Sequence, residues 1–460
     1  MPSIIHKIIA RTSPFHALPV AKLTDSGSRK QCLWFAVVAS GIGLMLVSPS
    51  AEVRGQTWQL GKPIVSYWAG PGYDGTTGPL TDAAAKQMVD VGVNLVWADS
   101  VKALDIAKRH GLRALYVDRS LIDPAVLDNP TLRPKLDKLI DSIRGHSALY
   151  GYHVIDEPSM ALFGGLARLV AYLHQRDPAH LAYIDLFPKI ADLKECLAAS
   201  SYNEYLTRFI GTVKPSLLSY DYYQFTTKND SSDYLPNLEV VAQKAKAAGI
   251  PFMTIVQAAS WTPTMRIPNG NEMRFLTYTT LAYGVQGISY YVWCYPGHQG
   301  GIVRADGTPS AIYGVLKATN REFVKVAEQC QSLKWIGAYL KGYRPGALPP
   351  GTTVLPNNSP FDIRAVSNAD TYKDGDKLKG VLFGLFGAKG VSPADATLVL
   401  VTNLDYAAGR TYTVTGPGNL SVFDATTGKW TATGRTDAAL SLAPGGGALV
   451  RLGTTAVGSF

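Results

Sequence analysis

Apolar extended runs alternate with amphipathic stretches from about residue 62 to residue 332, and this rhythm constrains the fold more than any other feature. A stretch of helical periodicity follows each run, and several of these stretches end in glycine, as helix C-caps do. Eight β-α units of this length are typical of a (β/α)₈ TIM barrel, an α/β fold. A doubly wound open sheet usually has fewer units and a glycine-rich first turn, and no GxGxxG motif occurs here. The eight runs lie at residues 62–70, 93–100, 112–120, 149–158, 181–188, 216–225, 251–260 and 287–297.

The pattern changes after about Leu333, where the helical signals stop. Short apolar runs then alternate with Gly, Asn, Asp and Pro turns, which predicts a C-terminal antiparallel β-sandwich domain. A chain of 460 residues is also long for one domain. We therefore predict a leader at residues 1–51, the barrel at 62–332 and the β-sandwich at 333–460.

The leader has the pattern of a signal peptide. Two basic residues, Arg29 and Lys30, precede an apolar run from Cys32 to Val47, and small residues follow up to a plausible cleavage point near Ala51. The run is short for a membrane span, although an uncleaved membrane anchor through residues 32–47 stays open as an alternative. Both alternatives predict that the body of the protein is exported, to the periplasm or beyond.

Charge and cysteine content argue against nucleic-acid binding, a disulfide framework and a metal site. The formal net charge is +9 without a Lys/Arg-rich run, so nucleic acid is not an expected partner. Outside the leader the chain has Cys196, Cys294 and Cys330, an odd number that gives no disulfide framework, although one bridge is possible. No Cys/His spacing indicates a metal site. We predict no metal, no cofactor and no protein partner.

Aromatic and acidic residues gather where the eight predicted strands end, which is where the site of a (β/α)₈ barrel forms. Aromatic rings stack on the C–H faces of sugars, and carboxylates bind hydroxyl groups or do acid/base chemistry. The expected partner is therefore a carbohydrate. The predicted substrate-binding residues are Tyr67, Trp68, Tyr222, Tyr223, Gln257, Trp261, Trp293 and His298.

Two adjacent carboxylates, Asp156 and Glu157, end the fourth run before Pro158. Neighbours on a strand point to opposite faces, so both can serve one site only where the strand ends and the backbone turns. Burial and mutual repulsion would raise the pKa of Glu157, which suits a proton donor, with Asp156 orienting it or the substrate. A capping Asp with a solvent-facing Glu is the alternative. His153, two residues earlier, is expected to pack rather than catalyse.

The sequence "DEPS" at this strand end resembles the Asn-Glu-Pro motif of clan A glycoside hydrolases, which are (β/α)₈ barrels. The eighth run "GISYYVW" and the sandwich tail are similar to β-galactosidases of family 42 and their relatives. This resemblance implies that Glu157 is the general acid/base. It covers the architecture of residues 62–455 but only a few short motifs.

One position departs from this pattern. Clan A enzymes carry their nucleophilic Glu at the end of strand 7, where this chain has Gln257. Another carboxylate could take the role, with Asp221 best placed and Glu272 behind it. The substrate could supply its own nucleophile, because the Asp156–Glu157 pair also resembles the pairs of N-acetylhexosaminidases in families 20 and 123. The barrel could also bind sugar without cleaving it. We predict an exported glycoside hydrolase with Glu157, Asp156 and Asp221 as catalytic residues.

Overall fold

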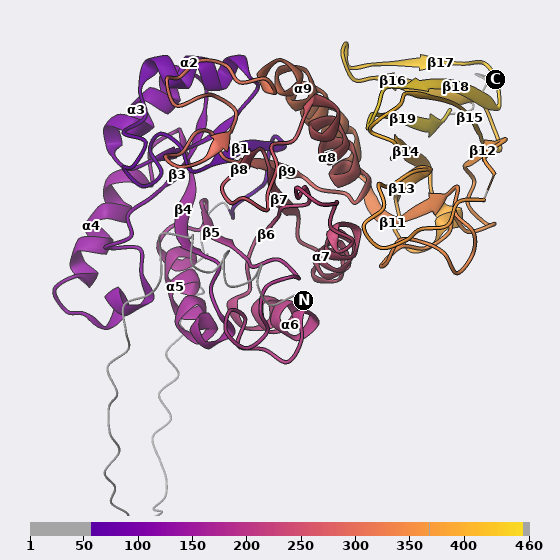
Figure 1. Cartoon of the computed structure of the whole chain (residues 1–460). Coiled ribbons are helices and arrows are strands. Elements are labelled where there is room, and N and C mark those ends of the chain that lie inside the picture. The colour runs from indigo at the N-terminus through magenta and orange to yellow at the C-terminus, as the bar shows by residue number, and fades with distance from the viewer. Residues whose placement is uncertain (1–56, 368, 454–460) are drawn as a thin grey trace, which may run out of the picture.

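The computed structural model describes residues 57–367 and 369–453, and the predicted leader lies outside this range (Figure 1). Two four-stranded sheets form the first part of the chain, and all neighbouring strands in them are parallel. One sheet has the order β2-β3-β4-β5 and the other β1-β9-β7-β6. Their strands are β1 (Ile64–Trp68), β2 (Leu95–Ala98), β3 (Arg113–Tyr116), β4 (Leu149–Asp156), β5 (Leu181–Asp185), β6 (Leu218–Tyr222), β7 (Phe252–Gln257) and β9 (Gly287–Tyr291). Each lies inside one of the eight predicted runs.

A helix follows each of these strands, as the sequence predicts. Polar N-caps begin several of them: Thr81, Ser100 and Ser201 accept hydrogen bonds from backbone amides two or three residues into the helix. The helices are α2 (Asp82–Asp90), α3 (Val101–Arg109), α4 (Arg133–Ile143), α5 (Phe163–Arg176), α6 (Tyr202–Val213), α7 (Tyr234–Ala248), α8 (Gly270–Ala282) and α9 (Tyr313–Cys330), with short 3₁₀ turns η1 (Pro124–Asp128) and η2 (Met160–Leu162).

The two parallel sheets meet at both pairs of edges. Between β1 and β2, the amide of Asn94 donates to the Val65 carbonyl (2.9 Å) and Trp97 Nε1 donates to the Tyr67 carbonyl (2.7 Å). Between β5 and β6, the amide of Leu186 donates to the Ser219 carbonyl (3.0 Å). The carboxyl ends of all eight strands therefore share one end of this part of the molecule.

Antiparallel strands fill the rest of the described chain, beginning at Lys334 beside the predicted boundary. A six-stranded sheet (β11-β13-β14-β19-β16-β17) and a three-stranded sheet (β12-β15-β18) enclose their own apolar core. The strands are β11 (Lys334–Lys341), β12 (Asp362–Arg364), β13 (Val381–Gly387), β14 (Leu398–Asn403), β15 (Arg410–Thr415), β16 (Leu420–Asp424), β17 (Lys429–Ala432), β18 (Asp437–Leu442) and β19 (Gly447–Leu452), with the turn η3 (Pro393–Asp395).

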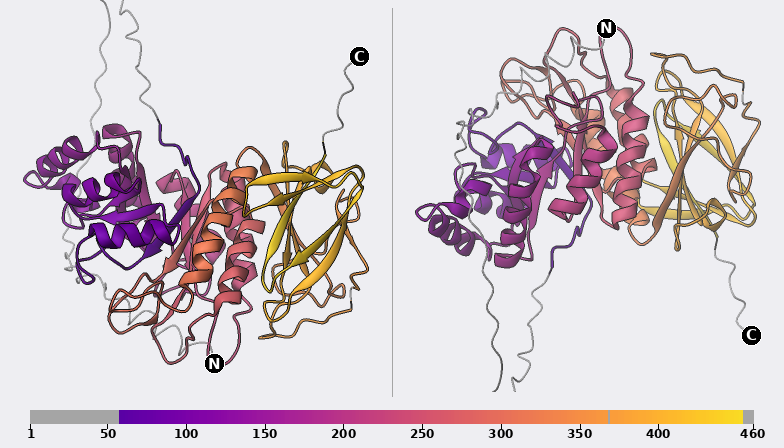
Figure 2. Two further views of the ribbon diagram at one scale, coloured as in Figure 1. Left: turned by 90° about the horizontal axis from the view of Figure 1, so that it is seen from above. Right: turned by 90° about the horizontal axis from the view of Figure 1, so that it is seen from below.

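This antiparallel domain packs on α8 (Figure 2). Most of the α8 side chains are buried. Trp335 Nε1 donates to the Ala282 carbonyl (3.0 Å), and Arg274 on α8 donates to the Pro444 carbonyl (3.0 Å). Gly384 on β13 permits the close approach, because a Cβ there would lie 2.4 Å from the Ala282 carbonyl oxygen. The two parts therefore share an extensive packed interface.

One expectation from the sequence concerns the cysteines beyond the leader. Cys196, Cys294 and Cys330 are all free thiols, so the one possible disulfide is not formed. None of the helices within residues 57–453 is both long and apolar enough to cross a membrane.

Candidate active site

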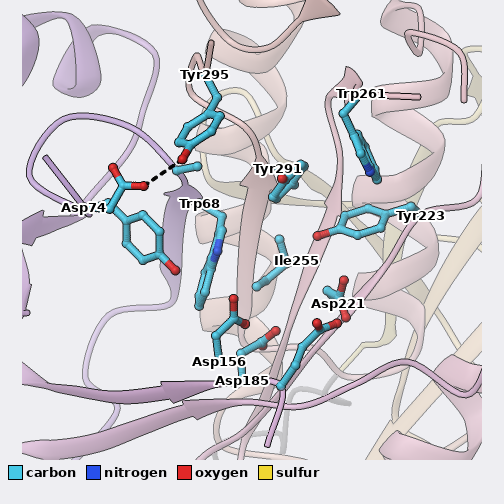
Figure 3. Close-up of a pocket in the computed structure, with 13 residues that line it drawn as sticks. Trp68, Asp74, Asp156, Asp185, Asp221, Tyr223, Ile255, Trp261, Tyr291 and Tyr295 are labelled. Carbon is cyan, nitrogen blue, oxygen red and sulfur yellow. Dashed lines mark hydrogen bonds between the residues drawn. The ribbon is translucent and has the colours of Figure 1, made fainter. Parts of the chain in front are cut away.

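A pocket opens where the parallel strands end (Figure 3). It encloses about 670 Å³, including the part open to solvent. Acidic side chains and aromatic rings supply most of its surface. The lining residues are Trp68, Ala69, Tyr73, Asp74, Asp156, Glu157, Asp185, Asp221, Tyr223, Ile255, Trp261, Tyr291 and Tyr295.

The backbone at Glu157 explains how two adjacent carboxyl groups reach one pocket. The backbone of Asp156 is still in register with Asp185 of β5, and the amide of Glu157 donates to the Asp185 carbonyl (3.0 Å). Glu157 itself has a φ of +46°, in the left-handed region that costs a non-glycine residue about 1 kcal/mol or more. The strand alternation is broken at this residue, and both side chains line the same pocket. Tyr205 Oη donates to the Pro158 carbonyl (2.7 Å) and fixes the chain just beyond the turn.

Four carboxyl groups share the floor of the pocket: Asp156, Glu157, Asp185 and Asp221. Figure 3 shows Asp156, Asp185 and Asp221 grouped at one end of the cavity. Burial raises the pKa of Glu157 well above its usual range, and the charges of Asp221, Asp156 and Asp185 raise it further. Burial and the charges of Asp221 and Asp156 raise the pKa of Asp185 well above normal in the same way. Burial and the neighbouring carboxylates therefore both favour the neutral form of Glu157.

Burial also raises the pKa values of the other two carboxyls, Asp221 and Asp156. Burial, and then the charge of Asp156, raises the pKa of Asp221 to about 8. Burial also raises the pKa of Asp156, but the positive charge of Arg119 opposes this and the pKa is about 7. The Arg119 guanidinium lies 4.7 Å from the centre of the Tyr73 ring, which itself lines the pocket. Arg119 thus favours the anionic form of Asp156.

Aromatic rings form the walls. On one side Tyr223 and Trp261 meet edge to face at 4.7 Å between ring centres, and Tyr291 packs on both at 5.2 and 4.8 Å. On the other side Trp68 lies against Tyr73 at 5.3 Å. Such rings offer faces to the C–H groups of a sugar, while the carboxyls below offer hydrogen bonds to its hydroxyl groups.

Four predicted substrate-binding residues do not line the pocket. Tyr67 and Trp293 are buried and pack against each other, with Tyr67 Oη bonded to the Pro71 carbonyl (2.8 Å). Tyr222 is buried and bonds Ser231. The His298 ring stacks on Trp261, and its Nε2 lies 3.0 Å from Tyr291 Oη. The prediction of substrate contact at these positions is not supported by their placement. Trp68, Tyr223 and Trp261 do line the pocket.

Gln257, at the end of β7, also lies outside the lining, and its amide is fully engaged by backbone. Oε1 accepts from the Phe225 amide (2.8 Å), and Nε2 donates to the carbonyls of Phe225 (3.0 Å), Ala259 (3.3 Å) and Arg266 (2.7 Å). Gln257 therefore holds two loops together, and its predicted substrate-binding role stays a prediction. Glu272 likewise bonds Arg266 and caps α8, so it is not a second carboxylate of the pocket.

Some site residues were not selected from the sequence. Asp185 ends β5 and was visible as an acidic strand end, and Ser219 Oγ donates to it (2.6 Å). Tyr73, Asp74 and Arg119 come from loops after strands, where no pattern marks side-chain direction. His153 packs among Trp68, Tyr73 and Trp97, and burial lowers its pKa to about 3, so it is neutral. In the part of the chain that the structure describes, no cluster of His, Cys, Asp and Glu is arranged to hold a metal ion.

No protein-family model and no curated protein matches this sequence. Similar solved structures include a β-galactosidase from Marinomonas ef1 (10% identity, 58% of this chain and 60% of that one, TM-score 0.42). They also include a β-galactosidase from Halorubrum lacusprofundi (9%, 84% and 99%, 0.44) and an endo-β-1,4-mannanase from Thermotoga petrophila (10%, 84% and 98%, 0.40). The chain spans about half to three fifths of the first four such structures. All of these TM-scores lie below 0.5, so any inference about activity has to rest on the site itself.

Proposed function

We propose that this protein is an exported glycoside hydrolase and that its two parallel sheets together form one (β/α)₈ barrel. The observation that carries the proposal is the placement of Glu157 beside three other carboxyl groups in a pocket walled by aromatic rings. Burial and these neighbours raise the pKa of Glu157, which favours its acid form. Hydrolysis of a glycosidic bond needs an acid to protonate the leaving oxygen and a second group to act at the anomeric carbon. The pocket holds candidates for both roles.

Glu157 is the general acid. Its carboxyl proton passes to the glycosidic oxygen as the bond to the anomeric carbon breaks, and a water supplies the hydroxyl of the released sugar. Asp221 is the preferred second carboxylate, because its Oδ1 has no hydrogen-bond partner among the described residues, whereas Asp185 is bonded to Ser219. In its anionic form Asp221 either takes a proton from the water, which gives inversion, or attacks the anomeric carbon directly, which gives retention.

A specific observation favours a second candidate, the substrate-assisted reaction. Asp156 is the carboxyl of the four whose anion is stabilised by a nearby cation, because the charge of Arg119 lowers its pKa against the effect of burial. An anionic Asp156 next to a protonated Glu157 is suited to orient a 2-acetamido group, whose own oxygen then attacks the anomeric carbon. In this version Asp221 has no part in bond formation.

The test of the proposed function is sugar release from matched pairs of substrates. Purified protein is incubated with oligosaccharides and aryl glycosides that carry either a 2-hydroxyl or a 2-acetamido group, and products are identified by mass spectrometry. Release from at least one substrate is expected. Cleavage limited to 2-acetamido sugars supports the substrate-assisted reaction, and cleavage of 2-hydroxyl sugars supports Asp221. Sugar that binds without cleavage across the panel contradicts the hydrolase proposal and favours a carbohydrate-binding barrel. N-terminal sequencing of the mature protein from its native host tests export.

A further inference from the structure

We propose that the antiparallel domain positions one wall of the pocket, with Tyr406 as the positioning residue. The wall concerned is the cluster of Tyr223, Trp261 and Tyr291. The expected effect on substrate binding rests on the proposed function. The positioning of the two loops by Tyr406 does not depend on it.

Two loops carry Tyr223 and Trp261 of the wall, while Tyr291 ends β9, and these two loops are tied to each other. The loop after β6 (residues 223–233) contains Tyr223, and the loop after β7 (258–269), which includes the two-residue strand β8 (Ala259–Ser260), contains Trp261. Gln257 bonds both of them, at Phe225 and at the Arg266 carbonyl. The Thr227 amide also donates to the Thr264 carbonyl (2.9 Å). A displacement of one loop therefore moves the other.

A buried ionic network holds the same two loops. Arg266 pairs with Asp230 of the first loop (3.1 Å) and with Glu272 at the start of α8 (2.8 Å), and its guanidinium lies 4.6 Å from the centre of the Phe225 ring. Asp230 and Glu272 are both buried. The Arg266 guanidinium is thus shared by two buried carboxylates, Asp230 and Glu272. Because one positive charge faces two negative charges, the second oxygen of Asp230 needs a further hydrogen bond.

The antiparallel domain supplies that hydrogen bond. Tyr406, in the segment after β14, donates its hydroxyl to Asp230 Oδ2. Its ring packs on Phe225 (6.1 Å) in the first loop and on Phe275 (5.3 Å) of α8. Tyr406 is therefore the contact through which the C-terminal domain completes the ionic network of the loops.

The test is Tyr406→Phe, with Tyr343→Phe as matched control. Tyr343 Oη also takes part in a hydrogen bond of the antiparallel domain, accepting from the Lys379 amide (2.8 Å), which lies outside the two loops. Hydrogen exchange measured by mass spectrometry on peptides spanning 224–231 and 258–267 is expected to be about tenfold faster in Tyr406→Phe, the size expected for loss of one hydrogen bond to a buried carboxylate. Tyr343→Phe should leave both peptides unchanged.

Asp230→Asn is the second variant, since it keeps the shape of the side chain but removes its charge; the same two peptides should exchange faster. On any substrate found to be cleaved, Tyr406→Phe should raise KM by about tenfold with kcat within about twofold, because the wall binds sugar and does not react. Unchanged exchange in both peptides overturns the inference, as does a fall in kcat at constant KM. The exchange measurement needs no substrate, so failure of the inference is distinguishable from failure of the proposed function.

Discussion

Glu157→Gln is expected to reduce cleavage of glycosides with poor leaving groups by about 10³-fold, the usual range for loss of a general acid. Glutamine keeps the size of the side chain but has no proton to give. Glycosides of acidic phenols, which leave without protonation, should lose less than about tenfold in the bond-breaking step. The measurement is kcat/KM for wild type and variant over a series of aryl glycosides of decreasing leaving-group pKa.

Glu195→Gln is the matched control, because Glu195 is an exposed glutamate on the segment between β5 and α6 and does not line the pocket. It should behave as wild type on every substrate. If Glu157→Gln cleaves poor substrates as fast as wild type, Glu157 is not the acid. The proton donor must then be sought in Asp221 or Asp185, whose pKa values are also raised.

Gln257→Glu is expected to lower the free energy of unfolding by about 3 kcal/mol or more. Nε2 of Gln257 donates to three backbone carbonyls, and a carboxylate there would place a buried negative charge against three acceptors. The substitution places a glutamate where clan A enzymes have their nucleophile, but the side chain lies outside the pocket, so no gain of activity is expected. Urea denaturation followed by circular dichroism measures the loss.

Gln59→Glu makes the same change at an exposed site and should alter stability by less than about 0.5 kcal/mol. A Gln257→Glu protein that is as stable as wild type contradicts the structural role given to Gln257. A gain in sugar release by that variant would show instead that the end of β7 reaches the substrate.

The order of strands and helices could be predicted because each element carries its own periodicity. The runs that became β1 to β7 and β9 are nearly continuous apolar segments, as strands buried on both faces are. Helices such as α3 have one apolar face and a polar N-cap. The change at Leu333 was visible because helical periodicity stops there. These signals are local, so sequence reasoning is sufficient for them.

The sequence predicted the site only where adjacent residues constrain the local backbone conformation. The adjacent Asp156 and Glu157 demanded a backbone turn, and the φ of +46° at Glu157 is that turn. Side-chain direction at the other strand ends depends on one residue of register, which is why Tyr222 is buried while Tyr223 lines the pocket. Tyr73 reaches the pocket, and Arg119 packs on its ring, through loop conformations that no periodicity encodes.

The central claim is that Glu157 is held as a neutral acid at neutral pH, and carbon-13 NMR of protein labelled at glutamate Cδ tests it without any substrate. The Glu157 signal is identified by its absence in Glu157→Gln. Because burial and the neighbouring carboxylates raise its pKa, the signal should keep the chemical shift of a protonated carboxyl from pH 5 to pH 7 and move only at higher pH. A signal that titrates between pH 4 and pH 5, like that of an exposed glutamate, would contradict the account.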